Sequence, residues 1–340
     1  MKLRDSHLFA KIAVAISAAA LGGLFLCAEE PAGVAGQQAP SNAGTVQTLK
    51  VTTEVVNVYA IVREKKGRLI PDLKQEDFQL SEDGGEQTIR YFSRETDTPL
   101  TMGILVDTSP SQVRVLGVEQ EEAKRFLHQV MRPKKDLVCV IHFDLEVELI
   151  QDFTDNLSYL GRAIDGTVIR GGASGPLPSP VPTSSVGGTH LYDAVYLAAT
   201  EMMKGQVGRK VLILLSDGVD QGSTIERDRA IEAAQKADLI IYSVDVSDPS
   251  FYWRRGGGFV GTSSLKKFSE QTGGRVIHVD RPEKTAAAFQ ELADELRTQY
   301  LLGYSSTNTR RDGSFRKIRV KVRGGDYKIQ ARNGYYAPAE

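Results

Sequence analysis

Six short apolar runs alternate with segments of helical periodicity in the middle of the chain. The runs cover residues 102–106, 137–143, 147–151, 211–215, 239–246 and 276–279. Residues 112–131 and 282–299 between and after them carry apolar side chains at helical spacing. Strands that alternate with helices form a mostly parallel sheet with helices on both faces. The sequence therefore predicts a Rossmann-like α/β domain over residues 99–299.

Both ends of the folded region have β character instead. Residues 49–98 contain an alternating β-branched run and an Asp83-Gly84 hairpin signal, which a returning strand over residues 88–92 follows. Residues 300–338 contain three further strand-like runs. Neither segment is large enough to bury a core alone. We therefore expect the two segments to form one small, sandwich-like all-β domain, with the α/β domain inserted between them.

The start of the chain resembles a targeting segment. Residues 1–28 combine a basic start with an uncharged apolar stretch, which predicts a signal peptide or an N-terminal anchor. Residues 29–48, rich in Ala, Gly, Ser, Pro and Gln, predict a flexible tether. We expect an exported protein that is periplasmic, secreted or associated with the cell envelope. Membrane contact is expected only through an uncleaved anchor.

Charge and cysteine content narrow the classes of partner. With 42 Lys and Arg against 43 Asp and Glu, the net charge of −1 offers no general basic field, so no nucleic acid is expected as a partner. Cys139 lies inside an apolar run and is interpreted as a core residue, and Cys27 lies in the N-terminal segment. No disulfide is expected.

Oxygen-bearing side chains gather directly after two of the predicted strands. Asp107, Ser109 and Ser111 follow the first run of the α/β region, and Asp217 follows the fourth, while Thr189 stands in a glycine-rich loop between them. The carboxyl ends of parallel strands are where open α/β sheets bind ligands. Hydroxyls and carboxylates are hard donors, which favours Mg²⁺ over zinc or copper. The sequence therefore predicts a metal site with Mg²⁺, and with Mn²⁺ or Ca²⁺ as alternatives.

In order and context these residues resemble the metal-ion-dependent adhesion site of the von Willebrand factor type A domain family, over residues 99–299. The resemblance implies that Asp107, Ser109, Ser111, Thr189 and Asp217 surround the cation. It also implies that a protein partner completes the shell with an Asp or Glu carboxylate. The segments around Thr189 and Asp217 and the Arg-Asn-Gly-Tyr-Tyr ending are similar to an exported bacterial subgroup of this family.

Three further residues are candidates for a second shell or a rim. Asp193 is either a second-shell acceptor or an acid favoured by a helix N-terminus, and His190 stands beside Thr189. Trp253 belongs to an aromatic and Arg-rich loop, a composition enriched at binding hot spots and also explained by half-buried packing. Residues 170–188, rich in Pro, Gly and Ser, are either a disordered insertion or a flap beside the metal.

Three functions fit these features. The favoured interpretation is a metal-dependent adhesion-type protein that captures an acidic side chain of a protein partner. The alternatives are a structural scaffold subunit of an envelope complex and a metal-dependent hydrolase. The chain lacks a glycine-rich phosphate loop, and no Lys, Arg or His motif is placed to act on a transition state. We therefore do not expect an enzyme, and no catalytic residue is assigned.

Overall fold

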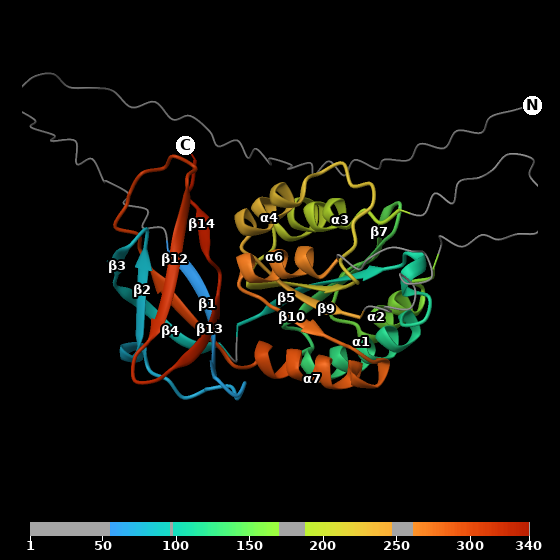
Figure 1. The fold of residues 1–340 in the computed structure, drawn as a ribbon, viewed down its shortest axis with the longest axis horizontal. Helices are drawn as coiled ribbons and strands as arrows, with labels where there is room; N and C mark the ends of the chain where they lie inside the picture. The colour runs from blue at the N-terminus through green and yellow to red at the C-terminus, as the bar shows by residue number, and fades with distance from the viewer. Residues whose placement is uncertain (1–54, 96–97, 170–187, 247–260, 340) are drawn as a thin grey trace, which may run out of the picture. The chain divides into compact units, whose positions relative to one another are not determined.

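A six-stranded sheet forms the centre of the α/β region (Figure 1). The computed structural model describes residues 55–95, 98–169, 188–246 and 261–339. The strand order is β10-β9-β8-β5-β6-β7, and all neighbours are parallel except β6 and β7. The strands are β5 (Leu100–Asp107), β6 (Leu137–Phe143), β7 (Val147–Thr154), β8 (Arg209–Leu215), β9 (Leu239–Asp245) and β10 (Val276–His278).

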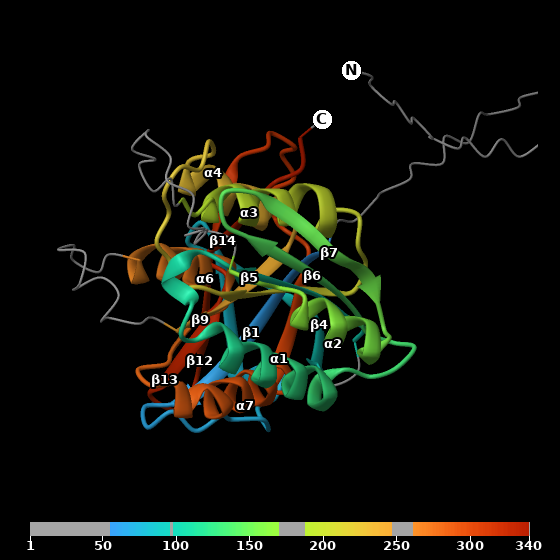
Figure 2. The same ribbon diagram turned by 90° about the vertical axis from the view of Figure 1, so that its right-hand side faces the viewer.

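Helices cover both faces of this sheet (Figures 1 and 2). One face carries α1 (Leu116–Val130), α2 (Leu157–Asp165) and α7 (Thr285–Leu296), and the other carries α3 (Leu191–Leu197), α4 (Arg227–Lys236) and α6 (Thr262–Thr272). Each face has its own apolar core, as expected for a sheet covered on both sides. Shorter turns are the 3₁₀ segments Gln75–Asp77, Pro110–Gln112 and Pro282–Lys284, and the π-helical turn Ala198–Met203 after α3.

Strands from both chain ends build two four-stranded antiparallel sheets. Their orders are β13-β1-β11-β4 and β14-β12-β2-β3. A shared core of buried side chains, including Val58, Leu80 and Leu302, lies between them. The strands are β1 (Val56–Glu64), β2 (Phe78–Glu82), β3 (Gly85–Gln87), β4 (Ile89–Glu95), β11 (Gln299–Tyr304), β12 (Phe315–Val322), β13 (Tyr327–Ala331) and β14 (Gly334–Tyr336).

The predicted fold class is therefore confirmed, with two local differences. The strand that returns after Asp83-Gly84 is not continuous, because β3 pairs with β2 whereas β4 pairs with β11 in the other sheet. The edge strand β7 is antiparallel to β6, because only residues 144–146 separate the two strands. A parallel pairing needs a crossover of a dozen or more residues.

The described residues belong to one compact unit, which spans residues 52–340. Within it, Arg63 of β1 forms a buried ion pair with Glu295 of α7, and Gln235 of α4 donates to Asn333 at 3.0 Å. In the part of the chain that the structure describes, no helix has the length and apolar character needed to cross a bilayer. The predicted N-terminal segment and tether, residues 170–187, and Trp253 lie outside the described residues.

Candidate metal centre

The loops that follow β5 and β8 meet at one edge of the central sheet. The two strands are parallel neighbours, and Val106 lies opposite Leu215. Asp107 therefore ends β5 beside Ser216 and Asp217, which follow β8. All three side chains are buried, with at most 1% exposed. The fold thus brings two carboxylates from distant parts of the sequence into one buried place.

The first loop folds back on its own aspartate. Asp107 Oδ1 accepts a hydrogen bond from the backbone N–H of Ser109 at 2.9 Å. Pro110 then begins a 3₁₀ turn, for which its fixed φ is well suited. This turn places the hydroxyls of Ser109 and Ser111 3.0 Å apart. Two hydroxyl oxygens and one carboxylate thus lie close together at the end of β5.

Hydrogen bonds connect the first and third loops directly. Ser216 Oγ donates to Asp107 Oδ2 at 2.6 Å and accepts from the backbone N–H of Gly218 at 3.0 Å. Gln112 Nε2 donates to Asp217 Oδ2 at 2.9 Å and to Ser111 Oγ at 3.2 Å. Each aspartate is therefore held by a residue of the other loop, which fixes the distance between the two carboxylates.

The threonine loop joins the same edge through its backbone. Thr189 and Gln221 exchange backbone hydrogen bonds of 3.0 and 2.9 Å, and Gln221 lies four residues beyond Asp217. The backbone N–H of His190 donates to the carbonyl of Asp144 at 2.7 Å, and Asp144 follows β6, the other neighbour of β5. The three loops predicted from the sequence thus lie at one edge of the sheet.

The two buried carboxylates of this site interact unfavourably with each other. Burial, and then the charge of Asp217, raise the pKa of Asp107 to about 7. Two like charges in a dry site repel each other, and a divalent cation would compensate both. Buried acceptor oxygens without a donor among the described residues lie nearby, namely Gln112 Oε1 and both carboxylate oxygens of Glu119. The residues therefore fit a cation.

The donor set favours a hard cation. Among the described residues, no three His, Cys, Asp or Glu side chains are grouped as a metal site. Direct donors would therefore be the hydroxyls of Ser109, Ser111 and Thr189 and the carboxylates of Asp107 and Asp217. A shell of this kind suits Mg²⁺.

The three candidate rim residues have different surroundings. The carboxylate of Asp193 accepts hydrogen bonds from the backbone N–H groups of Thr224 and Ile225, at 3.0 and 2.8 Å. These bonds hold the loop beyond Asp217, so Asp193 supports the edge rather than pointing a free acceptor at a cation. His190 precedes α3 as its N-cap residue. Trp253 is not among the described residues.

Sequence reasoning assigned no role to three buried residues in or near this edge. Ser216 precedes Asp217 and donates a hydrogen bond to Asp107. Gln112 was treated as the start of a helix. Glu119 lies on the buried stripe of α1, where it is fully buried among apolar residues. The available signal for Glu119 was an acid at helical spacing from Leu116 and Ala123, both of which are apolar.

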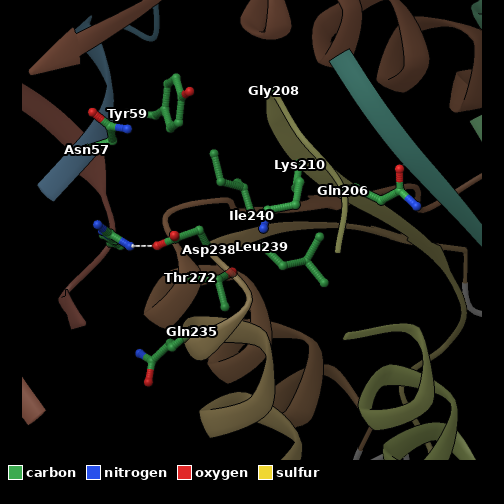
Figure 3. A pocket seen from close by; sticks show the side chains of 11 residues that line it. Asn57, Tyr59, Gln206, Gly208, Lys210, Gln235, Asp238, Leu239, Ile240 and Thr272 are labelled. Atoms are coloured by element: carbon green, nitrogen blue, oxygen red, sulfur yellow. Dashed lines mark hydrogen bonds and ion pairs between the residues drawn. The ribbon is translucent and has the colours of Figure 1, made fainter. Parts of the chain in front are cut away.

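A separate cavity of about 130 Å³ lies at the opposite ends of β8 and β9 (Figure 3). Lys210 near the start of β8, Leu239 at the start of β9 and Tyr59 of β1 line it, and the figure marks the ion pair between Asp238 and Arg332. Burial lowers the pKa of Lys210. None of the residues predicted for the metal site lines this cavity.

Comparisons with known proteins found similar solved structures. No family profile and no curated protein matches the sequence. Similar solved structures include proximal thread matrix protein 1 from the mussel byssus, which is 16% identical with a TM-score of 0.47 and is matched over 64% of this chain. A von Willebrand factor type A protein from Catenulispora acidiphila is 11% identical with a TM-score of 0.45, and 77% of this chain and 74% of that chain are covered.

A third similar structure is an aerotolerance-related membrane protein from Bacteroides fragilis. It is 16% identical with a TM-score of 0.41, and 58% of this chain and 98% of that chain are covered. This chain spans about half the length of the mussel protein, with 51% covered. At these identities and scores the likeness concerns the fold alone.

The doubly wound sheet, its antiparallel edge strand and the three loops define a Rossmann-like domain with its ligand edge at the ends of β5 and β8. The Asp-x-Ser-x-Ser, Thr and Asp positions occupy that edge. This arrangement is the one that the resemblance to the von Willebrand factor type A domain family led us to expect.

Proposed function

We propose that this chain binds a divalent cation, with Mg²⁺ favoured, and uses it to capture an acidic side chain of a protein partner. One observation carries the proposal: the hydroxyl oxygens of Ser109 and Ser111 lie 3.0 Å apart at the edge of the sheet where two buried aspartates also lie. A cation held mostly by neutral hydroxyls keeps a strong attraction for an incoming carboxylate. The cation would be held by these serines, Thr189, Asp107 and Asp217.

A pull-down from cell-envelope extract tests this function. Wild type and Asp107→Ala are compared with Mg²⁺ and with EDTA, and Asp228→Ala, an exposed acid at the start of α4, is the control. We expect partners that wild type and the control retain in Mg²⁺ and lose in EDTA, and that Asp107→Ala never retains. The same set of partners in all lanes would reject the metal bridge.

A scaffold subunit with a structural cation is the second candidate, because Asp107 and Asp217 are buried and linked by hydrogen bonds through Ser216 and Gln112. Under this alternative the cation stabilises the fold without binding a partner. Folded Asp107→Ala that loses partners favours capture, whereas an unfolded variant favours the scaffold. We propose no catalytic step, because the residues that would hold the cation offer hydroxyls and carboxylates and no catalytic residue is assigned.

We also propose that the protein acts outside the cytoplasm, tethered or released according to how residues 1–28 are processed. Fractionation of cells, followed by mass determination of the mature N-terminus, tests this. Recovery of the full-length chain in the cytoplasm would contradict it.

A further inference from the structure

Glu119 is an anomaly in the core of the protein. Helix α1 turns a stripe of buried side chains toward the sheet, and every other member of the stripe is apolar. Glu119 is 0% exposed, and neither of its carboxylate oxygens receives a hydrogen bond from a described residue. Glutamate is almost never fully buried without a partner. We therefore expect a nearby group that compensates the carboxylate at this position.

Helical hydrogen bonds connect Glu119 to the first loop of the metal centre: its backbone N–H donates to the carbonyl of Val115 at 3.0 Å, and the N–H of Val115 donates to the carbonyl of Gln112 at 3.0 Å. Burial, and then the charges of Asp107 and Asp217, raise the pKa of Glu119 well above its usual range. Gln112 contributes a further buried acceptor, since its Nε2 donates to Asp217 and Ser111 while its Oε1 has no donor among the described residues. Buried acceptors without donors, beside two carboxylates, are the environment that a cation and its bound water satisfy.

We propose that Glu119 is a third carboxylate of the cation site, acting from behind Asp107 and Asp217 and outside the direct donors. Its position outside the direct shell follows from the absence, in the described part of the chain, of three grouped acidic or metal-binding side chains. Its negative charge strengthens cation binding through space and through water. This inference rests on the proposed cation site and is independent of the acidic partner.

A spectator role for Glu119 predicts something different. A carboxyl group that stays neutral whether or not the cation is present adds no attraction for it. Replacing that group by the neutral, similarly shaped glutamine would then leave cation affinity unchanged. The two roles are therefore separated by a single substitution that removes charge and little else.

Calorimetric titration of the purified chain with Mg²⁺ gives the decisive measurement. We expect Glu119→Gln to weaken Mg²⁺ binding by about 10- to 100-fold, the usual effect of losing an outer-shell partner of a metal. Glu121→Gln is the matched control, because Glu121 lies on the same helix, is 61% exposed and pairs with Lys124. The control should bind Mg²⁺ as wild type does. Equal affinity of Glu119→Gln and wild type would overturn the proposal.

A second measurement separates this effect from general damage to the fold. In EDTA, Glu119→Gln should be about as resistant to urea as wild type, because a neutral amide of similar shape replaces a buried carboxyl group whose pKa lies well above its usual range. Weaker cation binding together with a less stable cation-free protein would also overturn the proposal. Should Glu119→Gln fail to fold, Glu119→Leu removes the same charge and undergoes the same two tests.

The outcomes distinguish this inference from the proposed function. If wild type binds no Mg²⁺, Mn²⁺ or Ca²⁺, the proposed function fails and the inference fails with it. If wild type binds the cation and Glu119→Gln binds it equally well, only the inference fails. If the cation binds as expected and no acidic partner is captured, the inference stands and the partner proposal fails.

Discussion

Replacing Asp107 by asparagine should make the cation-free protein more stable while abolishing its response to Mg²⁺. Burial and the charge of Asp217 raise the pKa of Asp107 from 3.8 to about 7. One pKa unit corresponds to about 1.4 kcal/mol, so an ionised Asp107 destabilises the cation-free protein by about 4 kcal/mol. Asparagine resembles the neutral acid in shape and removes this penalty.

The pH dependence has a definite sign. The folded protein holds the Asp107 proton more tightly than the unfolded chain does, so the penalty is absent below about pH 4. It grows as the pH rises to about 7 and is constant above that. We therefore expect Asp107→Asn and wild type to be about equally stable near pH 4, with the variant more stable near pH 8 by up to about 4 kcal/mol.

The local hydrogen bonds allow this substitution. The amide oxygen of asparagine can still accept from the backbone of Ser109, and its NH₂ group can face Ser216 Oγ, which already accepts from Gly218. The hydroxyl proton of the buried Ser216, which Asp107 Oδ2 accepts in wild type, loses this acceptor in the variant. We therefore expect part of the gain, about 1 to 3 kcal/mol, to be lost to this broken hydrogen bond.

Urea unfolding in EDTA at the two pH values measures the effect, with Asp228→Asn as an exposed control. In Mg²⁺ at 100 times its dissociation constant, wild type should gain about 2.7 kcal/mol and the variant almost nothing. A variant that is less stable than wild type near pH 8 in EDTA would refute the reasoning. It would mean that the Asp107 charge is stabilised by the protein alone.

Three further substitutions test residues that stabilise the loops of the site and the fold of the chain. Gly218→Ala should destabilise the protein by about 1 to 3 kcal/mol in thermal unfolding, because Gly218 has φ +78° and a Cβ there would lie 2.4 Å from a backbone oxygen. The control Gly117→Ala should not destabilise the protein, because the space around a Cβ at Gly117 is open. Glu295→Ala should reduce the free energy of unfolding in urea by about 3 to 5 kcal/mol, because it leaves Arg63 buried without its ion pair. Asp193→Ala should lower the free energy of unfolding by about 1 to 2 kcal/mol while changing Mg²⁺ affinity less than twofold. A tenfold loss of Mg²⁺ affinity would instead mean that Asp193 belongs to the second shell of the cation.

The fold was predictable because its signals are local and repeat along the chain. Each parallel strand is a short apolar run, and the helices carry apolar stripes of period 3.6. The direction of β7 was predictable in principle, since residues 144–146 are too few for a crossover. The exchange of β4 between sheets was not, because it depends on which partner strand is nearer in space, and that strand, β11, lies some 200 residues away.

The meeting of Asp107 and Asp217 at one edge was predictable for a similar reason. Parallel strands end at the same edge of a sheet, so Asp107 and Asp217 had to lie close together once β5 and β8 were recognised. The residues that hold them were not predictable, because Gln112 and Ser216 act across loops that lie about a hundred residues apart in sequence. Their side chains are common in turns and carry no periodic signal.

Glu119 changes how the charge of the site should be counted. A bound divalent cation would neutralise Asp107 and Asp217, so a charged Glu119 would leave the buried site with one net negative charge. Under the proposal, that charge would strengthen cation binding and weaken the attraction for a partner's carboxylate. Once Mg²⁺ saturates the site, Glu119→Gln should therefore bind acetate, the simplest carboxylate, more tightly than wild type in a calorimetric titration. Weaker acetate binding would mean that Glu119 maintains the shape of the site and does not act through its charge. Only the loss of a negative charge can weaken Mg²⁺ binding and strengthen acetate binding at the same time.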